Sequence, residues 1–432
     1  MADFGTPYWW EDGAPLPDLP ETPPQKTELA VIGAGYTGLS AAITARRAGA
    51  EVTVLDAAIP GQGASTRNGG MFGAHTRISI DAMSKSFGRA AAVAILNEAP
   101  QAYAFTRGFI QAENIQCDFQ QTGRIVLASG STAQATQVRL ATSLKKLTGY
   151  ELGIVAPAEV KDHINTDIYA GGIFYEDHGG LQPRKLHDGL LEIALREGVN
   201  IIQNCAVLDV GGREGAFILK TAKGDLQADK LIHATNGYTR KPFRWLERRV
   251  FPLPSFIIAT EPLPPEQIAR LAPGRRMMVE TRAKHSYYRI SPDGTRIVFG
   301  GRAGMVPLGP KLAAKRLKAT MVGIWPELKD VKITHSWRGY TGFTFEQMPH
   351  VGQFEGRHFA MGYSGSGVAM APYLGMKVAY QALGDKRGET AYSLTTPSTR
   401  LYHHGGYPLF LAAGEVWYRQ VVDRLEARRA KE

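Results

Sequence analysis

The first apolar stretches of the chain predict a strand, a glycine turn, a helix and a second strand. The apolar run Leu29–Ile32 is followed by three spaced glycines, by small and apolar residues over 37–48, and by a second apolar run over 51–55. A strand, a helix and a strand in this succession form a βαβ unit, whose strands lie parallel in one sheet. We therefore expect an α/β fold that opens on a Rossmann-type unit.

The rest of the pattern predicts a second set of strands within this α/β body. Helical spacing covers residues near 88–114, 184–197 and 368–383, and short strands are expected over 199–210 and 229–234. Residues 250–345 have strand-like patterning, and the stretch from Ser286 to Gly300 predicts a hairpin that turns at Pro292–Gly294. A parallel α/β body interrupted by antiparallel strands predicts two interleaved domains.

Both ends of the chain differ from this body. Residues 1–26 contain six prolines, which are excluded from helix interiors and central strands, so we expect an arm. Its Tyr8-Trp9-Trp10 sequence either packs on its own chain or contacts another subunit. At the other end, the apolar spacing over Glu415–Lys431 predicts a terminal helix that docks on the body rather than on a membrane.

Composition narrows the class of protein. With 432 residues, of which 44% are hydrophobic and 21% charged, the chain suits two or three globular domains. The net charge of +10 is scattered, so we expect no nucleic-acid partner. Cys117 and Cys205 lack metal-ligand spacing, and no apolar run reaches about 18 residues. We expect a cytoplasmic protein without a metal, a disulfide framework or a membrane span, and the oligomeric state stays open.

The first turn has the sequence pattern of a dinucleotide site. A G-x-G-x-x-G turn joins the first strand to the first helix, and an aspartate follows the second strand. The glycines permit a tight turn and the close approach of a pyrophosphate, and the acid takes the ribose hydroxyls. The predicted contacts are Gly33, Gly35, Tyr36, Thr37, Gly38 and Asp56. This fingerprint by itself suits FAD and NAD equally.

Three more glycine-bearing segments follow far along the chain. They are Ser65–Gly70, the strand end at 234–237, and Gly362–Gly367 before an apolar helix. Backbone without side chains lets a flat ring system lie close to it. Segments spread this widely suit an extended FAD better than an NAD held by one compact domain.

Several motifs in a fixed order carry a resemblance. They are the fingerprint, S-x-R-N-G-G at 65–70, Thr260–Leu263, Tyr287–Gly294, Phe299–Arg302, Met348–Gly352 and the G-Y-S-G-x-G turn at 362–367. Together they resemble the D-amino-acid-oxidase-like flavoprotein superfamily, and within it the γ-glutamylputrescine oxidase branch is most alike. The resemblance spans nearly the whole chain and implies FAD and oxidation of a C–N bond. The further FAD contacts expected are Ser65, Arg67, Asn68, Gly69, Gly70, Met71, Val207, Ala234, Thr235, Gly237, Gly339, Ser364, Gly365, Ser366, Gly367 and Val368.

The resemblance also implies the two-domain architecture of glutathione reductase and D-amino-acid oxidase. In it, a Rossmann-type FAD-binding domain is interleaved with an antiparallel-sheet substrate domain. We assign residues 1–26 to the arm, 27–100, 156–247 and 335–390 to the FAD-binding domain, 101–155 and 248–334 to the substrate domain, and 391–432 to a C-terminal extension.

Departures from the relatives change the expected chemistry. Relatives that tether flavin through cysteine or histidine carry those residues where this chain has Arg338 and Thr66–Arg67, so we expect non-covalent FAD. The lysine that promotes reaction with oxygen in sarcosine oxidases aligns with Val298, which leaves O2 or another electron acceptor open. Their lysine for the substrate carboxylate aligns with Ala369, which disfavours a glycine-like N-methyl acid.

The expected reaction is hydride transfer from a small primary or secondary amine, γ-glutamylputrescine-like or related, to flavin N5, followed by hydrolysis of the imine. The helix that opens at Ser364–Val368 is expected to stabilise the charge on the reduced flavin. Tyr288, Trp337 and His350 are the candidates for catalytic contacts, although each also suits a core. Arg289 points to the other face of the strand and suits a structural ion pair.

Two other functions stay open. An amino-acid or N-substituted amino-acid dehydrogenase would pass electrons to a quinone or carrier protein. A flavin-binding partner subunit would hold FAD without turnover, in line with the missing lysine positions.

Overall fold

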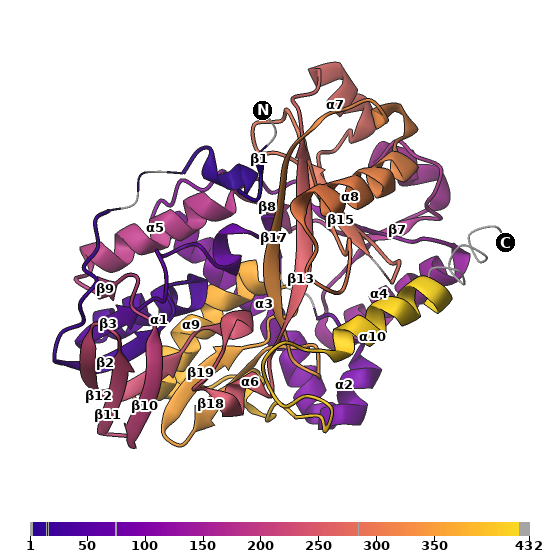
Figure 1. The fold of residues 1–432 in the computed structure, drawn as a ribbon. Coiled ribbons are helices and arrows are strands. Elements are labelled where there is room, and N and C mark those ends of the chain that lie inside the picture. The colour runs from indigo at the N-terminus through magenta and orange to yellow at the C-terminus, as the bar shows by residue number, and fades with distance from the viewer. Residues whose placement is uncertain (1–2, 14, 16, 74–75, 284, 423–432) are drawn as a thin grey trace.

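Two large sheets lie side by side, one on the left of Figure 1 and one in its centre and right. The computed structural model describes residues 3–13, 15, 17–73, 76–283 and 285–422. Segments far apart in the sequence alternate between the two sheets. The α/β class and the two-sheet architecture predicted from the sequence are confirmed.

The sheet on the left of Figure 1 contains the predicted βαβ unit. Its strand order is β10-β11-β12-β2-β3-β9, and β19 and β18 continue it beside β12. Strand β2 leads through α1 (Tyr36–Arg47) to β3, its parallel neighbour, as predicted. The strands are β2 Lys26–Ile32, β3 Val52–Leu55, β9 Asn200–Ile202, β10 Val207–Arg213, β11 Ala216–Thr221, β12 Gly224–His233, β18 His350–Phe354 and β19 Arg357–Met361.

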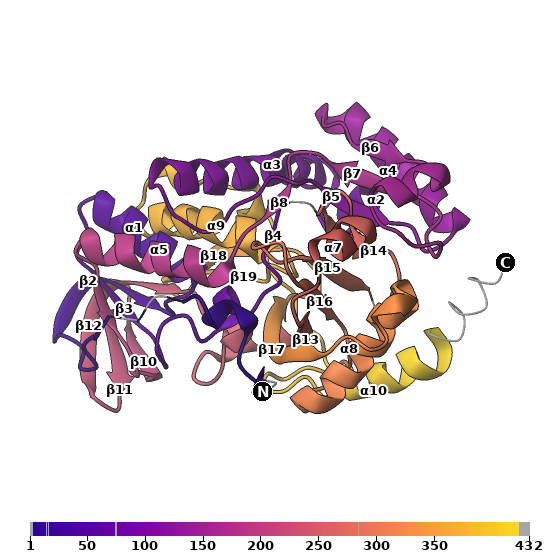
Figure 2. The same ribbon diagram turned by 90° about the horizontal axis from the view of Figure 1, so that it is seen from above.

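Helices α1 and α9 (Gly367–Ala382) pack against each other beside this sheet (Figure 2). A Cβ on Gly375 of α9 would lie 2.4 Å from the carbonyl oxygen of Thr37, so only glycine permits this approach. Helix α5 (Pro183–Arg196) contacts α1, and α3 (Arg89–Ala112) contacts α9. The three helices predicted near 88–114, 184–197 and 368–383 are thus confirmed.

The second sheet has the order β1-β17-β13-β16-β15-β14-β5-β7-β6. Most neighbours are antiparallel, and the exceptions are β1 with β17 and β14 with β5. The predicted hairpin is confirmed by β15 and β16. The strands are β1 Asp3–Phe4, β5 Arg124–Leu127, β6 Gly153–Val155, β7 Gly172–Tyr175, β13 Phe251–Thr260, β14 Met277–Glu280, β15 Ser286–Ile290, β16 Ile297–Gly301 and β17 Ile333–Phe343. A short pair, β4 Met71–Phe72 and β8 Gly179–Gly180, lies apart from both sheets.

Two helices that the strand-like interpretation of residues 250–345 missed cover one face of this sheet. They are α7 (Pro265–Leu271) and α8 (Pro310–Ile324). Helix α8 begins with proline in its first turn and buries Ala313, Leu317 and Met321 at helical spacing. These side chains pack with residues of β13, β15 and β16. The remaining helices are α2 Ile80–Phe87, α4 Ser131–Thr148, α6 Arg244–Glu247 and α10 Phe410–Trp417.

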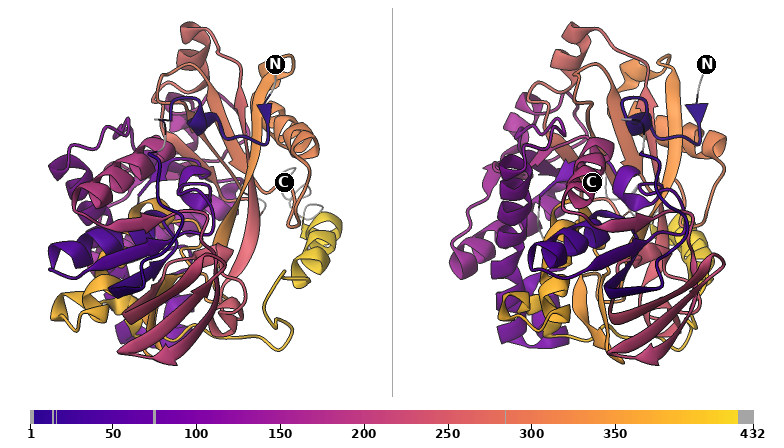
Figure 3. Two further views of the ribbon diagram at one scale, coloured as in Figure 1. Left: turned by 60° about the vertical axis from the view of Figure 1, so that its left-hand side comes forward. Right: turned by 90° about the vertical axis from the view of Figure 1, so that its left-hand side faces the viewer.

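The N-terminal arm packs on its own chain. Strand β1 pairs with β17, and Figure 3 shows this indigo strand beside the orange one. Tyr8 and Trp9 are buried with Ile257 and Trp337 of the second sheet. Of the two predicted roles for the aromatic residues, the structure shows packing within the chain.

The C-terminal helix docks through other residues than those predicted. Leu411 of α10 is buried with Phe251 and Phe343. Val416 and Trp417 are exposed, because α10 turns these side chains away from the body. Residues 423–432 of the predicted helix lie outside the described residues.

Two strands differ from the domain assignment made on sequence. Strand β17 pairs along its length with β13, and β7 pairs with β5, so both lie in the nine-stranded sheet. The sequence assigns residues 335–390 and 156–247 to the FAD-binding domain, so these two strands correct that assignment. The other domain boundaries stay predictions. Across the described ranges, no helix is long and apolar enough to cross a membrane, and no three acidic, His or Cys side chains group as metal ligands.

Candidate functional site

The turn between β2 and α1 has no room for side chains. A Cβ on Gly38 would lie 1.8 Å from the carbonyl oxygen of Gly33, and one on Gly35 would lie 2.9 Å from Oγ of Ser65. Gly33 has φ +103°, which other residues rarely adopt. The turn therefore requires glycine at positions 33 and 38, and Gly35 leaves the backbone bare at the N-terminus of α1, where a phosphate is favoured.

Asp56 directs its carboxylate at the same turn. One oxygen accepts a hydrogen bond from the backbone N of Ala34 at 2.7 Å, and the other accepts one from the backbone N of Ala58 at 2.9 Å. Burial raises the pKa of this carboxyl, and the two N–H donors oppose the rise. The acid is thus fixed at the carboxyl edge of the parallel strands, where nucleotides bind in such sheets.

The other predicted contacts from this sheet lie near the same edge. Ala234 and Thr235 follow β12, and Gly237 approaches β17, since a Cβ there would lie 2.9 Å from the backbone N of Gly342. Val207 begins β10 and is buried in the cluster that contains Ile32 and Leu55. Their contact with FAD stays a prediction.

The segment after β3 folds back over the start of α1. Oγ of Ser65 accepts a hydrogen bond from the backbone N of Tyr36 at 3.0 Å. The Asn68 amide donates to the carbonyl oxygens of Ala64 and Ser65 and accepts from the backbone N of Gly70 at 2.8 Å. The side chain of Asn68 therefore fixes the bend that keeps Ser65–Gly70 beside the first helix.

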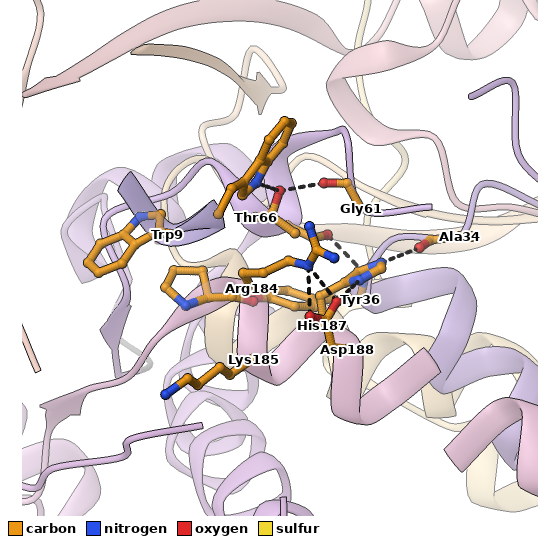
Figure 4. Close-up of polar contacts among 12 residues, drawn as sticks. Trp9, Ala34, Tyr36, Gly61, Thr66, Arg184, Lys185, His187 and Asp188 are labelled. Atoms are coloured by element: carbon orange, nitrogen blue, oxygen red, sulfur yellow. Dashed lines mark hydrogen bonds and ion pairs between the residues drawn. The ribbon is translucent and has the colours of Figure 1, made fainter. Parts of the chain in front are cut away.

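The N-terminal arm supports this segment from outside (Figure 4). Nε1 of Trp9 donates to the carbonyl oxygen of Asn68 at 2.7 Å, and Nε1 of Trp10 donates to the hydroxyl of Thr66 at 2.9 Å. The Thr66 hydroxyl donates in turn to the carbonyl oxygen of Gly61. The arm thus contributes two indole donors to the segment that carries the predicted FAD contacts.

A cavity of about 620 Å³ lies between this segment and the nine-stranded sheet. Its wall includes Tyr287 of β15, whose hydroxyl shares a hydrogen bond of 2.8 Å with Oγ of Ser255. A Cβ on Gly69 would lie 2.8 Å from the Tyr287 ring, and one on Gly300 would lie 2.2 Å from it. Burial raises the pKa of Tyr287 to about 12, so its hydroxyl keeps the proton at neutral pH.

Many of the predicted cofactor contacts meet in the wall of this cavity. They are Arg67, Asn68, Gly69, Met71, Gly339, Ser364, Gly365, Ser366 and Val368. The glycines of the first turn and Asp56 are not among the lining residues. The structure therefore brings together segments from three distant parts of the sequence, and their contact with FAD stays a prediction.

The N-terminus of α9 stands at the cavity. Ser364 has φ +49°, and its backbone N donates to the carbonyl oxygen of Gly342 at 3.0 Å. Ser366 donates to the carbonyl oxygen of Tyr363 through its backbone N at 3.0 Å and its hydroxyl at 2.9 Å. The first N–H groups of a helix lack partners within it and carry partial positive charge. Negative charge in this part of the cavity is therefore stabilised.

Arginines dominate the charge of the cavity. Its charged lining residues are Arg67, Arg77, Arg124, Glu280, Arg282 and Arg302. Glu280 pairs with Arg282 and accepts a hydrogen bond from the backbone N of Ser286 at 2.9 Å. The cavity as a whole favours anionic ligands.

The predicted contact from Tyr288 is wrong. Its ring stacks on Phe299 at 5.1 Å between centroids, and its hydroxyl lies 2.8 Å from that of Tyr169. The side chain is fully buried under α8, on the face of the sheet away from the cavity. Because successive strand residues point to opposite faces, the neighbouring Tyr287 takes the cavity side.

Arg289 does point to the face opposite Tyr288, as predicted. It is buried, and its Nη1 donates to the carbonyl oxygens of Gly70 and Leu181, both at 2.9 Å. These acceptors replace the expected acidic partner. Arg289 therefore ties β15 to the end of the Ser65–Gly70 segment.

Trp337 does not line the cavity. It is buried against Trp9, with ring centroids 6.3 Å apart, and its Nε1 donates to the carbonyl oxygen of Arg67 at 3.0 Å. The arm covers this end of β17, which corrects the expected substrate contact. Trp337 instead holds the backbone of a residue that does line the cavity.

His350 is also placed away from the cavity. Its Nδ1 lies 3.1 Å from the carbonyl oxygen of Thr395, and its Nε2 lies 3.5 Å from a carboxylate oxygen of Glu346. Although burial opposes the shift, the nearby His350 ring and the hydrogen bond from Ser398 lower the pKa of Glu346 to about 2. His350 thus joins β18 to the C-terminal extension, which corrects its expected role.

Neither cysteine lies in the cavity wall. Cys117 and Cys205 are both free and buried, and burial raises the pKa of the Cys117 thiol to about 12. A thiol held in its neutral form is a poor nucleophile. Non-covalent cofactor binding stays the prediction.

The sequence interpretation missed several residues of the cavity. They are Arg77, Arg124, Ser255, His285, Tyr287 and Arg302. The alternation of the hairpin carried a usable signal, because Tyr287, Gly300 and Arg302 share one face. No local pattern marks Arg77 or Arg124, which reach the cavity from distant segments.

Comparisons with known proteins agree with this geometry. The family model described as "FAD dependent oxidoreductase" (DAO) matches residues 28–381. A probable oxidoreductase OrdL of Rhizobium meliloti is 32% identical over 87% of this chain and 88% of its own length. The gamma-glutamylputrescine oxidoreductase of Escherichia coli is 28% identical over 92% of this chain and 93% of its own length.

Solved structures share the fold. Glycine oxidase from Geobacillus kaustophilus superposes with a TM-score of 0.69 at 18% identity, over 88% of this chain and 99% of that one. L-amino acid deaminase from Proteus vulgaris gives a TM-score of 0.70 at 15% identity, again over 88% and 99%.

Proposed function

Because the chain belongs to the DAO family of FAD-dependent oxidoreductases, we propose that it oxidises the C–N bond of a small primary or secondary amine. Bound FAD supplies the two-electron acceptor for oxidation of the amine to an imine, which water then hydrolyses to a carbonyl compound and either ammonia, from a primary amine, or an amine, from a secondary one. The electrons then pass to O2 or to another acceptor.

The residues of this chain fit FAD. The cradle of Gly33, Gly35 and Gly38 presents bare backbone and suits the pyrophosphate. Asp56 suits the ribose at the same edge. Segment Ser65–Met71 and the start of α9 would hold the flavin end, since both line the cavity.

One observation carries the proposal: the cavity lies between the segments with the predicted FAD contacts and a polar wall formed by the nine-stranded sheet. Tyr287 and Ser255 present paired hydroxyls there, and both residues belong to strands of that sheet. This wall would orient an amine against the cofactor segments. The N-terminus of α9 would stabilise negative charge that develops during reduction.

The acceptor and the location are also part of the proposal. Val298, the position of the oxygen-activating lysine in sarcosine oxidases, is buried with Trp9 and Trp337. This placement keeps an amino-acid dehydrogenase with a quinone or carrier-protein acceptor as a second candidate. Two free buried cysteines fit the reducing cytoplasm that the sequence predicts.

Anaerobic reduction of the bound flavin tests the proposed function. The purified yellow protein is mixed with a panel of primary and secondary amines, and the visible absorbance is followed. We expect at least one amine to bleach the flavin, while the matched alcohols do not. Flavin that stays oxidised with every amine would favour a partner subunit without turnover. With a bleaching amine in hand, peroxide formation under air separates an oxidase from a dehydrogenase.

A further inference from the structure

Three guanidinium groups from separate elements gather at one cavity. Arg302 follows β16, Arg124 begins β5, and Arg77 lies between β4 and α2. His285, just before β15, lines the same cavity. Because the three arginines come from distant parts of the sequence, the fold itself brings these charges together.

Two of these arginines have no acidic partner within the described part of the chain. Arg77 donates to the side-chain oxygen of Gln347 at 3.2 Å, and its guanidinium lies 5.3 Å from the centroid of the Phe343 ring. No carboxylate of a described residue forms an ion pair with Arg77 or Arg302. Glu280, the acidic residue of the cavity wall, forms its ion pair with Arg282. The cavity therefore offers two cationic groups to a ligand.

The charged groups at the cavity affect one another's protonation. Burial, with help from Arg302 and Arg124, lowers the pKa of Arg77 to about 10. Burial and the same three guanidinium groups lower the pKa of His285 to about 3, so this ring is neutral at pH 7. Arg302 is half-buried and Arg77 is exposed at the mouth of the cavity, and like charges that line one cavity favour an anionic ligand. Arginine pairs with carboxylates through two parallel hydrogen bonds, which makes carboxylates the matching ligand groups.

We propose that the amine oxidised at this site carries two carboxylates, one bound by Arg77 and one by Arg302. This inference rests on the proposed function, because it names the substrate class of the same cavity. The pyrophosphate of FAD does not satisfy these arginines, since the Gly33–Gly38 turn is outside the cavity wall. A substrate with a cationic end opposite its reacting amine is disfavoured by the same charges.

Binding of unreactive acids tests the inference without turnover. Succinate and glutarate are titrated into the FAD-loaded protein at fixed ionic strength, with butyrate as the acid of similar size and one carboxylate, and the flavin spectrum is followed. We expect the better diacid to bind at least about tenfold more tightly than butyrate. Equal affinities for the two diacids and butyrate would overturn the inference.

Two variants assign the carboxylates. Arg302→Gln should weaken diacid binding at least about tenfold and change butyrate binding less. Arg77→Gln gives an independent test where Arg302→Gln does not fold. Arg270→Gln is the matched control, because Arg270 is exposed on α7 and pairs with Glu327 outside the cavity. Diacid affinity that survives both cavity variants would overturn the assignment.

Paired amines connect binding to turnover. N-methylglycine and iminodiacetate differ by one carboxylate and are compared by anaerobic flavin reduction. Faster reduction by the diacid at equal low concentration supports the inference. Equal reduction by both amines would overturn it and leave the proposed function standing. If no amine of any class reduces the flavin, the proposed function fails, and the inference fails with it.

Discussion

The two faces of the β15–β16 hairpin share one backbone, but their side chains have different surroundings. On one face, Tyr288 and Phe299 pack with Trp325 under α8 in a buried aromatic cluster. On the other face, Tyr287 and Arg302 line a polar, cationic cavity. One residue step along a strand changes the surroundings from core to site. A residue that aligns with an active-site residue of a relative can therefore be assigned the same role only when it is known which face of the strand is covered by a helix.

The largest expected effect is the loss of FAD from the protein without a change in the core on the other face of the hairpin. Gly35→Val places a branched side chain where even a Cβ would lie 2.9 Å from Oγ of Ser65. The variant should purify colourless and fail to take up added FAD, with a circular dichroism spectrum like that of the parent. Gly108→Val is the control, because a Cβ there meets nothing within 4 Å. A yellow, fully loaded Gly35→Val protein would remove the turn from the FAD site.

A substitution on the core face should lower the stability of the protein and leave the cavity unchanged. Tyr288→Ala removes a fully buried ring that stacks on Phe299 and contacts Trp325 at its edge. We expect a loss of about 3–5 kcal/mol in the free energy of unfolding, measured by urea denaturation. The rate of flavin reduction per folded, FAD-loaded molecule should stay the same. A lower rate at full FAD occupancy would return Tyr288 to the active site.

The N-terminal arm packs against the segment that carries predicted FAD contacts, so loss of one of its side chains should have an intermediate effect on FAD binding. Trp10→Ala loses the hydrogen bond to Thr66 and the contact with the Arg67 guanidinium, which lies 4.7 Å from the ring centroid. The two interactions together contribute about 1–2 kcal/mol. We therefore expect FAD to bind about fivefold to thirtyfold more weakly. Equilibrium dialysis measures the affinity. Trp417→Ala, which alters an exposed tryptophan of α10, should leave it unchanged.

The smallest change compares the two hydroxyls directly. Tyr287→Phe removes the hydrogen bond to Ser255, and we expect it to change the rate of flavin reduction by up to about tenfold. Tyr288→Phe removes the contact with the Tyr169 hydroxyl, and we expect a loss of about 1 kcal/mol in stability without a kinetic effect. Stopped-flow reduction and urea denaturation together measure both. The opposite pattern would exchange the roles of the two faces.

Local patterns were enough to predict one unit in each sheet. The fingerprint glycines, the βαβ unit around α1 and the hairpin of β15 and β16 each depend on residues close in sequence. The cavity depends instead on long-range packing. Tyr287 and Tyr288 are equivalent until α8 covers one face of the strand, and α8 was itself hidden in a stretch patterned like strands.

The charged part of the site had a sequence signal at Arg302 alone, which shares a hairpin face with Tyr287. Arg77 and Arg124 are unremarkable among the many basic residues of the chain, and only long-range packing brings them to the cavity that Arg302 lines. His350 shows the opposite error. It lies within a recognised motif, yet its ring faces Glu346, four residues earlier, and Thr395, in a segment whose position no local pattern gives.

The pairing of β1 with β17 has a consequence for how the protein is made. Asp3 and Phe4 find their partners at His335 and Ser336, so the first strand has no neighbour until most of the chain has left the ribosome. An unpaired strand edge invites association with other nascent chains. The two-residue length of β1 and the prolines that follow it limit that hazard while the chain waits for its partner.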